Sequence, residues 1–103
     1  MNDRLAKLLK ILALEPTDAF TLYGVAQEYA KIGDTASAVA HYDRCLAADP
    51  GYCYAYYHKA KTQVDSGDES AAIATLKLGI ETAKRVNDGK ALGELTALLD
   101  SLT

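Results

Sequence analysis

The feature that most constrains the fold is an internal repeat, because the chain matches itself when it is displaced by 34 residues. The identical pairs are Pro16 and Pro50, Tyr23 and Tyr57, Ala26 and Ala60, Gly33 and Gly67, Asp34 and Asp68, Ala38 and Ala72, and Ala40 and Ala74. Leu12, Leu46 and Ile80 extend the same spacing over three consecutive segments. A period of this length predicts an array of stacked structural repeats.

Each period contains the signals of two helices. Gly33 is a typical residue after the end of a helix, and the side chain of Asp34 can cap the helix that follows. Pro50 ends the unit because proline lacks the N–H that a helix interior needs. Apolar residues have helical spacing in both halves, at Leu22, Val25, Ala26 and Tyr29 and again at Val39, Tyr42, Cys45 and Leu46. Each period therefore predicts two helices with one apolar face each.

The composition agrees with a single folded domain that is entirely α-helical. The chain has 103 residues, 50% of them hydrophobic and 24% charged, which is typical of globular proteins. Only two prolines and seven glycines interrupt a sequence rich in good helix formers. The net charge of -3 gives no cationic surface for a polyanion, so we expect no nucleic-acid partner.

The sequence favours a cytoplasmic location. Cys45 and Cys53 are too few to form the disulfide framework of a small secreted domain. Lys7 and Lys10 interrupt the only leucine-rich stretch near the N-terminus, so it does not have the apolar core of a signal peptide. No apolar stretch approaches the roughly 20 residues that span a bilayer, and we expect no membrane partner.

The segment 19–52 closely resembles the tetratricopeptide repeat (TPR), a helix pair of the same period. The positions typical of that family are occupied by Leu22, Val25, Ala26, Tyr29, Ala38, Tyr42, Cys45 and Pro50, with Gly33 and Asp34 at the turn. The resemblance implies an all-α fold in which antiparallel helix pairs stack as a short right-handed superhelix. About six helices are expected, including a C-terminal capping helix.

We expect one domain, 1–103, with four parts. These are a half-repeat helix at 1–16, a first repeat at 17–50, a second and looser repeat at 51–86, and a capping helix at 89–103.

The second repeat departs from the family pattern at three positions. Lys59 and Gln63 occupy places where apolar and aromatic residues are usual, and Lys84 stands in place of the closing proline. The last helix of this repeat is therefore expected to run to about Val86, where Asn87, Asp88 and Gly89 break it.

The C-terminal segment carries a stripe of four leucines, Leu92, Leu95, Leu99 and Leu102. Repeat arrays need an atypical unit that covers the apolar face at each end, so this stripe predicts a capping helix. The alternative is a structural role in which the stripe, or the edge left by the half-repeat, forms a homodimer.

The resemblance also implies a peptide-binding site, because the first helix of each pair lines the concave side in this family. The residues carried to that side are Phe20, Tyr23, Gln27 and Lys31, then Tyr54, Tyr57, Lys61 and Asp65, with Tyr52 at the junction. Aromatic rings beside two lysines favour a protein or peptide partner. The alternative for each tyrosine is that it packs against a neighbouring helix.

The sequence gives no indication of an enzyme. His41 and Cys45 are four residues apart, but they lack the second ligand pair of a structural zinc site, and Cys45 occupies a small core position. No phosphate-binding loop, nucleophile elbow or pair of carboxylates in an apolar context is present. We therefore expect no catalytic residue, no metal and no cofactor.

Overall fold

The computed structural model describes residues 3–103, and that part of the chain forms helices and no strands. The helices are α1 (Asp3–Leu14), α2 (Ala19–Lys31), α3 (Thr35–Ala48), α4 (Cys53–Asp65), α5 (Glu69–Arg85) and α6 (Gly89–Leu102). Residues 1 and 2, which belong to the half-repeat expected at 1–16, lie outside the described residues. The expected all-α fold is confirmed, whereas the division into repeats stays a prediction.

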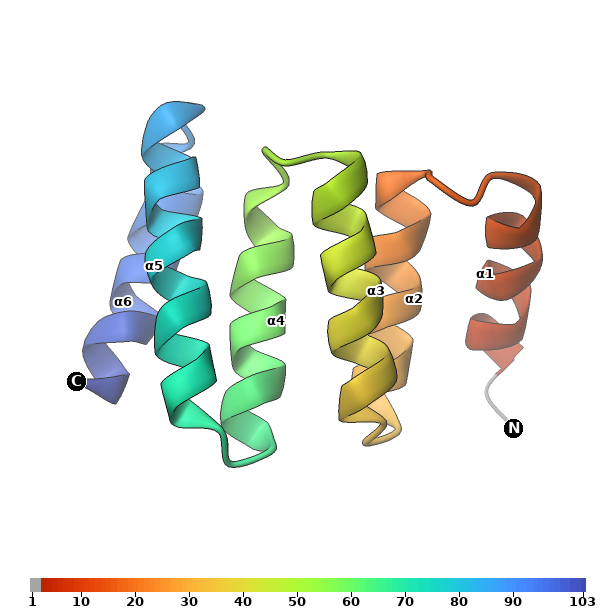
Figure 1. Cartoon of the computed structure of the whole chain (residues 1–103), viewed down its shortest axis with the longest axis horizontal. Helices are drawn as coiled ribbons and strands as arrows, with labels where there is room; N and C mark the ends of the chain where they lie inside the picture. Colours follow the sequence, from red (N-terminus) through yellow and green to blue (C-terminus); the bar gives the residue numbers. More distant parts are fainter. Residues whose placement is uncertain (1–2) are drawn as a thin grey trace.

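The helices follow one another along the array, with α1 at one end and α5 and α6 at the other; in this view α2 lies partly behind α3, and α6 lies behind α5 (Figure 1). Each helix packs on the next along the chain, most extensively α2 on α3 and α4 on α5. In addition α2 approaches α4, and α4 approaches α6, whereas α3 and α5 make no such approach within the described residues. The row is therefore tighter on the side of α2, α4 and α6, which makes this its inner side.

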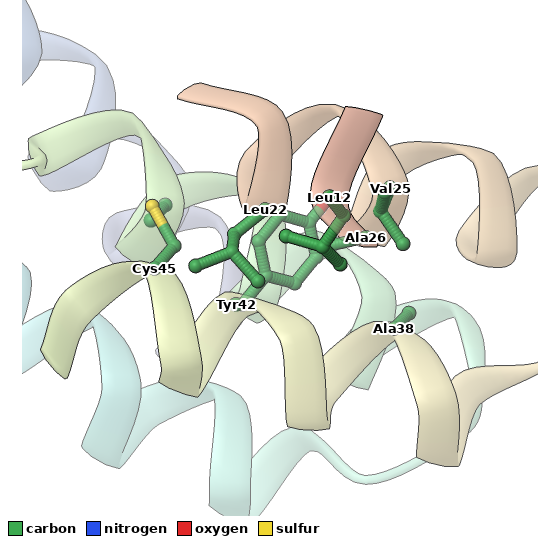
Figure 2. Packing of buried hydrophobic residues seen from close by; sticks show 8 residues of the cluster. Leu12, Leu22, Val25, Ala26, Ala38, Tyr42 and Cys45 are labelled. Carbon is green, nitrogen blue, oxygen red and sulfur yellow. The ribbon is translucent and has the colours of Figure 1, made fainter. Parts of the chain in front are cut away.

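The first half of the core gathers around Tyr42 of α3, whose side chain is 1% exposed. Figure 2 shows Leu22 of α2 and Leu12 of α1 beside Tyr42, with Ala26 close by and Val25 on the side of Ala38. The second half repeats this arrangement with smaller side chains, namely Cys53, Ala60, Ala72, Leu76, Ala83, Ala91 and Leu95. Burial of these apolar faces is the main term that holds the pairs together.

The turns follow the expected chemistry with one exception. Gly33 and Gly67 have φ angles of 80° and 89°, a conformation in which L side chains are strained. The carboxylates that accept a backbone N–H at a helix start belong to Asp18, Asp34, Asp68 and Asp88. After α5, it is Asn87 that takes the positive φ, 60°. Gly89 is the first residue of α6, where the capping helix was expected to begin, and Asp88 caps it.

The unusual polar residues of the second repeat have partners. The Lys59 ammonium lies 2.7 Å from an Asp43 carboxylate oxygen on α3. The Thr75 hydroxyl donates a hydrogen bond of 2.7 Å to the side-chain oxygen of Gln63. Lys59 and Gln63 therefore connect α4 to both neighbouring helices where the family usually has apolar contacts.

The helices of the second pair approach each other closely at Gly79 of α5 and Tyr56 of α4. A Cβ added at Gly79 would lie 2.7 Å from the Tyr56 Cβ and 3.1 Å from a Leu95 methyl. We predict that Gly79→Ala lowers the free energy of unfolding by about 1 to 3 kcal/mol, because overpacking a close crossing strains the backbone.

The matched control is Gly93→Ala on α6, where an added Cβ meets nothing within 4 Å. There alanine should stabilise the helix by up to about 1 kcal/mol, through propensity alone. Urea unfolding followed by circular dichroism measures both variants. A Gly79→Ala protein as stable as wild type would contradict the proposed crossing.

Candidate functional site

A series of aromatic rings runs from α2 to α4 on the inner side, with Tyr23 at its centre. The Tyr23 ring centroid lies 5.0 Å from that of Tyr52, 5.6 Å from that of His58 and 6.1 Å from that of Tyr42. The contacts with Tyr42 and His58 are edge-to-face, the arrangement that aromatic quadrupoles favour. Tyr23 therefore links three helix segments: the body of α3, the start of α4 and the middle of α4.

The series continues along α4. The His58 ring lies 5.2 Å from Tyr57, and Tyr57 lies 6.4 Å from Tyr54. The Lys61 ammonium is 5.8 Å from the Tyr57 ring centroid, within the range of a cation–π contact. The rings and this lysine form a continuous amphipathic strip. We call its rings the aromatic strip: Tyr23, Tyr42, Tyr52, Tyr54, Tyr57 and His58.

An open cleft of about 300 Å³ lies beside this strip, between α2 and α4. It is lined by Gln27, Ala30, Lys31, Tyr42, His58, Lys61, Thr62 and Asp65. Gln27, Lys31, Lys61 and Asp65 belong to the site expected from the sequence, so the structure brings these four together. Two lysines, one carboxylate and an amide surround a partly aromatic floor.

The other expected site residues lie outside the cleft. Tyr23, Tyr52 and Tyr57 belong to the aromatic strip and are half-buried. Tyr54, also half-buried, turns toward the far end of the array and hydrogen-bonds the Glu94 side chain of α6. Phe20 is 73% exposed near the start of α2.

The sequence did not reveal the charge arrangement at the cleft. Glu28 is only 3% exposed, and its carboxylate lies 3.1 Å from the Arg4 guanidinium and 3.0 Å from the Lys31 ammonium. A buried carboxylate needs such partners. Lys31 is therefore held by Glu28 at one wall of the cleft, and α1 is tied to α2 by Arg4.

Four tyrosines of the strip stay protonated at neutral pH: Tyr23, Tyr42, Tyr52 and Tyr54. Burial raises the pKa of Tyr23 to about 12 and raises the pKa values of Tyr42 and Tyr52 above their ordinary value. The pKa of Tyr54 rises to about 12, first because its hydroxyl bonds to Glu94 and then because of burial. Those hydroxyls that reach solvent can thus donate hydrogen bonds to a ligand.

His58 was not among the expected site residues, although it directly follows Tyr57. Burial lowers the pKa of His58, and the nearby Lys61 lowers it further, against an opposing effect of Glu94. The imidazole at the cleft is therefore neutral at pH 7. Its position could not be found from periodicity, because it depends on how α2 and α4 approach each other.

The residues weighed for metal or thiol chemistry have structural roles. The His41 Nδ1 bonds the Ser37 carbonyl oxygen at 2.7 Å, and burial raises the pKa of Cys45 to about 11. Within residues 3–103, no group of three or more His, Cys, Asp or Glu side chains could hold a metal ion. None of the helices in that same range has the length and apolar character that crossing a membrane requires.

Comparison with known proteins identifies the family. The tetratricopeptide repeat model matches residues 29–98, which is more than half of the chain. This chain belongs to the tetratricopeptide repeat family. Members of this family are generally non-catalytic protein-interaction scaffolds. No curated protein matches the sequence.

Solved structures agree with this assignment. A tetratricopeptide repeat domain protein from Salinibacter ruber is 33% identical in its crystal structure, which covers 82% of this chain and 94% of that chain with a TM-score of 0.73. Its solution structure covers 84% and 88%, with a TM-score of 0.77. The solution structure of a Bordetella parapertussis protein has a TM-score of 0.84 over 99% of this chain and 89% of its own, and at 24% identity it supports the fold alone.

The lowered pKa of His58 predicts an acid-sensitive fold. Because the folded state binds a proton at His58 less readily than the unfolded chain, it holds fewer protons once the pH falls below about 6.5, the ordinary pKa of histidine. The free energy of unfolding should therefore fall as the pH drops from about 7.5 to 5, and His58→Gln should reduce this loss.

Urea unfolding at a series of pH values measures the effect. His41→Gln is the control, because His41 lies on α3 away from the cleft and bonds its own helix. An acid-side loss of stability that is the same in wild type and His58→Gln would contradict the prediction.

Proposed function

We propose that this chain binds a peptide segment of a partner protein on the inner side of the helix array. The observation that supports the proposal is the cleft of about 300 Å³ between α2 and α4, which lies next to the aromatic strip and between Lys31 and Lys61. Concave sites with an apolar floor and a few polar groups are typical of ligand binding. The bound segment can be extended or helical.

The chemistry of the inner side suits a polypeptide. Half-buried tyrosine rings offer large contact area while losing little rotamer entropy on binding. Gln27, which donates a hydrogen bond of 3.3 Å to the Tyr23 hydroxyl, can exchange this bond for a backbone carbonyl. Lys61 is exposed above Tyr57 and can meet a carboxylate or a carbonyl of the ligand.

The full proposed site extends beyond the cleft in both directions. Phe20 and Tyr52 would contact the segment near the start of α2, and Tyr54 and Tyr57 would contact it toward α6. Lys31 and Asp65 would hold it at the two walls of the cleft. Because Tyr23 packs against the core, Tyr23→Phe is a better probe than truncation to alanine.

In this proposal the chain is a scaffold without catalytic activity, and it acts in the cytoplasm. Both cysteines are free and buried, which suits a reducing compartment. The thiol of Cys45 is protonated at neutral pH and is not a nucleophile.

Affinity capture from a lysate of the source cells tests whether the cleft between α2 and α4 binds a partner protein. Wild type and a Gln27→Ala, Lys61→Glu double variant are compared as baits, and the partner's binding segment is then synthesised as a peptide. We expect the double variant to bind this peptide at least about tenfold more weakly, a loss of about 1.4 kcal/mol, because it removes a donor and reverses a charge at the cleft.

The matched control is Lys77→Glu, which reverses an exposed lysine on α5, away from the inner side. Circular dichroism establishes that all baits are equally folded. Amide NMR shifts in the wild type should map the peptide to α2 and α4. Equal binding by the double variant and wild type would show that the ligand site lies elsewhere.

A further inference from the structure

The last helix repeats the pattern of a first helix. Leu92, Leu95, Thr96 and Leu99 on α6 have the same spacing as Leu22, Val25, Ala26 and Tyr29 on α2. Moreover, α6 packs on α5 and α4 as α4 packs on α3 and α2. By sequence and by position, α6 is thus the first helix of a pair.

The face of α6 that a second helix would cover is partly open. On α2 the corresponding Leu22 and Ala26 are 1% and 0% exposed, because α3 covers them. Leu92 and Thr96 are only half-buried, although Leu95 between them is 0% exposed against α5. Within the described residues no second helix packs on this side of α6.

The first helix of the chain, α1, has the pattern of a second helix but no first helix of its own pair to pack against among the described residues. A displacement of 34 residues places Leu8 and Ile11 of α1 on Tyr42 and Cys45 of α3, which are buried against α2. Ile11 is instead 48% exposed, and Leu14 at the end of α1 is 84% exposed. α1 is therefore a second helix whose contact face is partly open, since Ile11 is exposed although Leu8 packs against the first core cluster.

The two open helices carry opposite charge. α1 has Arg4, Lys7 and Lys10 against Asp3, whereas α6 has Asp100 and Glu94, the latter bonded to Tyr54 of its own copy, against Lys90. Contact between α1 of one copy and α6 of another brings unlike charges together. Contact between two α1 helices or two α6 helices would bring like charges together, which costs free energy.

We propose that copies of this chain associate head to tail, with α6 of one copy docked on α1 of the next as α2 is docked on α3. The docked pair would be somewhat wider than α2 and α3, because Arg4 stands where Ala38 allows a close crossing. The Arg4 side chain is 64% exposed and its guanidinium pairs with Glu28, at the rim of the new contact. Such an interface is heterologous and forms chains or rings.

Head-to-tail docking would join the inner sides of successive copies. The row of α2, α4 and α6 in one copy (Figure 1) would continue into α2 of the next copy, past the docked α1. The peptide site would then lengthen with assembly. This extension rests on the proposed function, whereas the association itself does not.

Sedimentation and light scattering over a wide concentration series test the association without any ligand. We expect the mean mass of wild type to rise with concentration. Ile11→Asp on α1 and Leu99→Asp on α6 should each hold the protein at the mass of one copy, because every contact then includes one altered face.

An equimolar mixture of the two variants provides the decisive measurement. It should form a dimer and nothing larger, since only the unaltered α6 of one variant and the unaltered α1 of the other can pair. Leu78→Asp, at an apolar side chain on α5 that is 56% exposed, is the matched control and should associate like wild type.

Three results would overturn the proposal: a wild type that stays monomeric, association that Leu99→Asp abolishes but Ile11→Asp leaves intact, or a mixture that stays monomeric. Because Leu99 also contacts the core, circular dichroism must show that its variant is folded. If it is not, concentration-dependent amide shifts in wild type replace it. Shifts at both α1 and α6 support head-to-tail docking, and shifts at only one of them exclude it.

Discussion

The structure depends on the close crossing of the two helices in each pair. Ala26 of α2 and Ala38 of α3 are both 0% exposed in the same core cluster, and side chains no larger than a methyl group permit a close approach of the two helices. This approach allows Tyr42 to reach across and be covered by Leu22 and, from α1, by Leu12 (Figure 2). In the second pair Gly79 lets α5 approach Tyr56 so closely that an added Cβ would lie 2.7 Å from the Tyr56 Cβ. These crossings fix the geometry within each pair. The geometry that they leave undetermined is the angle at which one pair stacks on the next.

Stacking of the pairs creates the inner side and its aromatic strip. α2 and α4 approach each other, and their tyrosines and His58 fill the space between them, in contact with Tyr42 of α3. The same rings therefore contribute to the core and to the wall of the cleft. Lys59 and Asp43 strengthen the junction between α3 and α4 with an ion pair of 2.7 Å, although a partly exposed pair contributes little free energy.

The sequence predicted the features that depend on local signals. Gly33, Asp34, Gly67 and Asp68 determine where helices end and begin, because a positive φ and a capping carboxylate are properties of single residues. The end of α5 near Val86 follows the same rule, since Asn87 adopts a positive φ there in place of a glycine.

Features that depend on contact between repeats were not predictable in the same way. The burial of Glu28 requires Arg4, which lies 24 residues earlier on another helix, and no local pattern joins the two. Likewise, periodicity placed Gln27 and Lys61 on the inner side but could not show that His58 lines the cleft with them. The angle between successive pairs determines these contacts, and it results from packing of many side chains together.

The requirement that an apolar helix face be covered applies to the terminal helices as well as to the internal ones. A helix with an apolar face needs a second helix at close range, and α2 and α4 have theirs in α3 and α5. α6 has a first-helix face that its neighbours cover only in part, and α1 has a second-helix face with Ile11 exposed. Within one copy these faces lie at opposite ends of the row and cannot meet (Figure 1). Because a repeat array gains free energy at every added interface, the simplest way to cover both faces is the contact that the chain already uses internally.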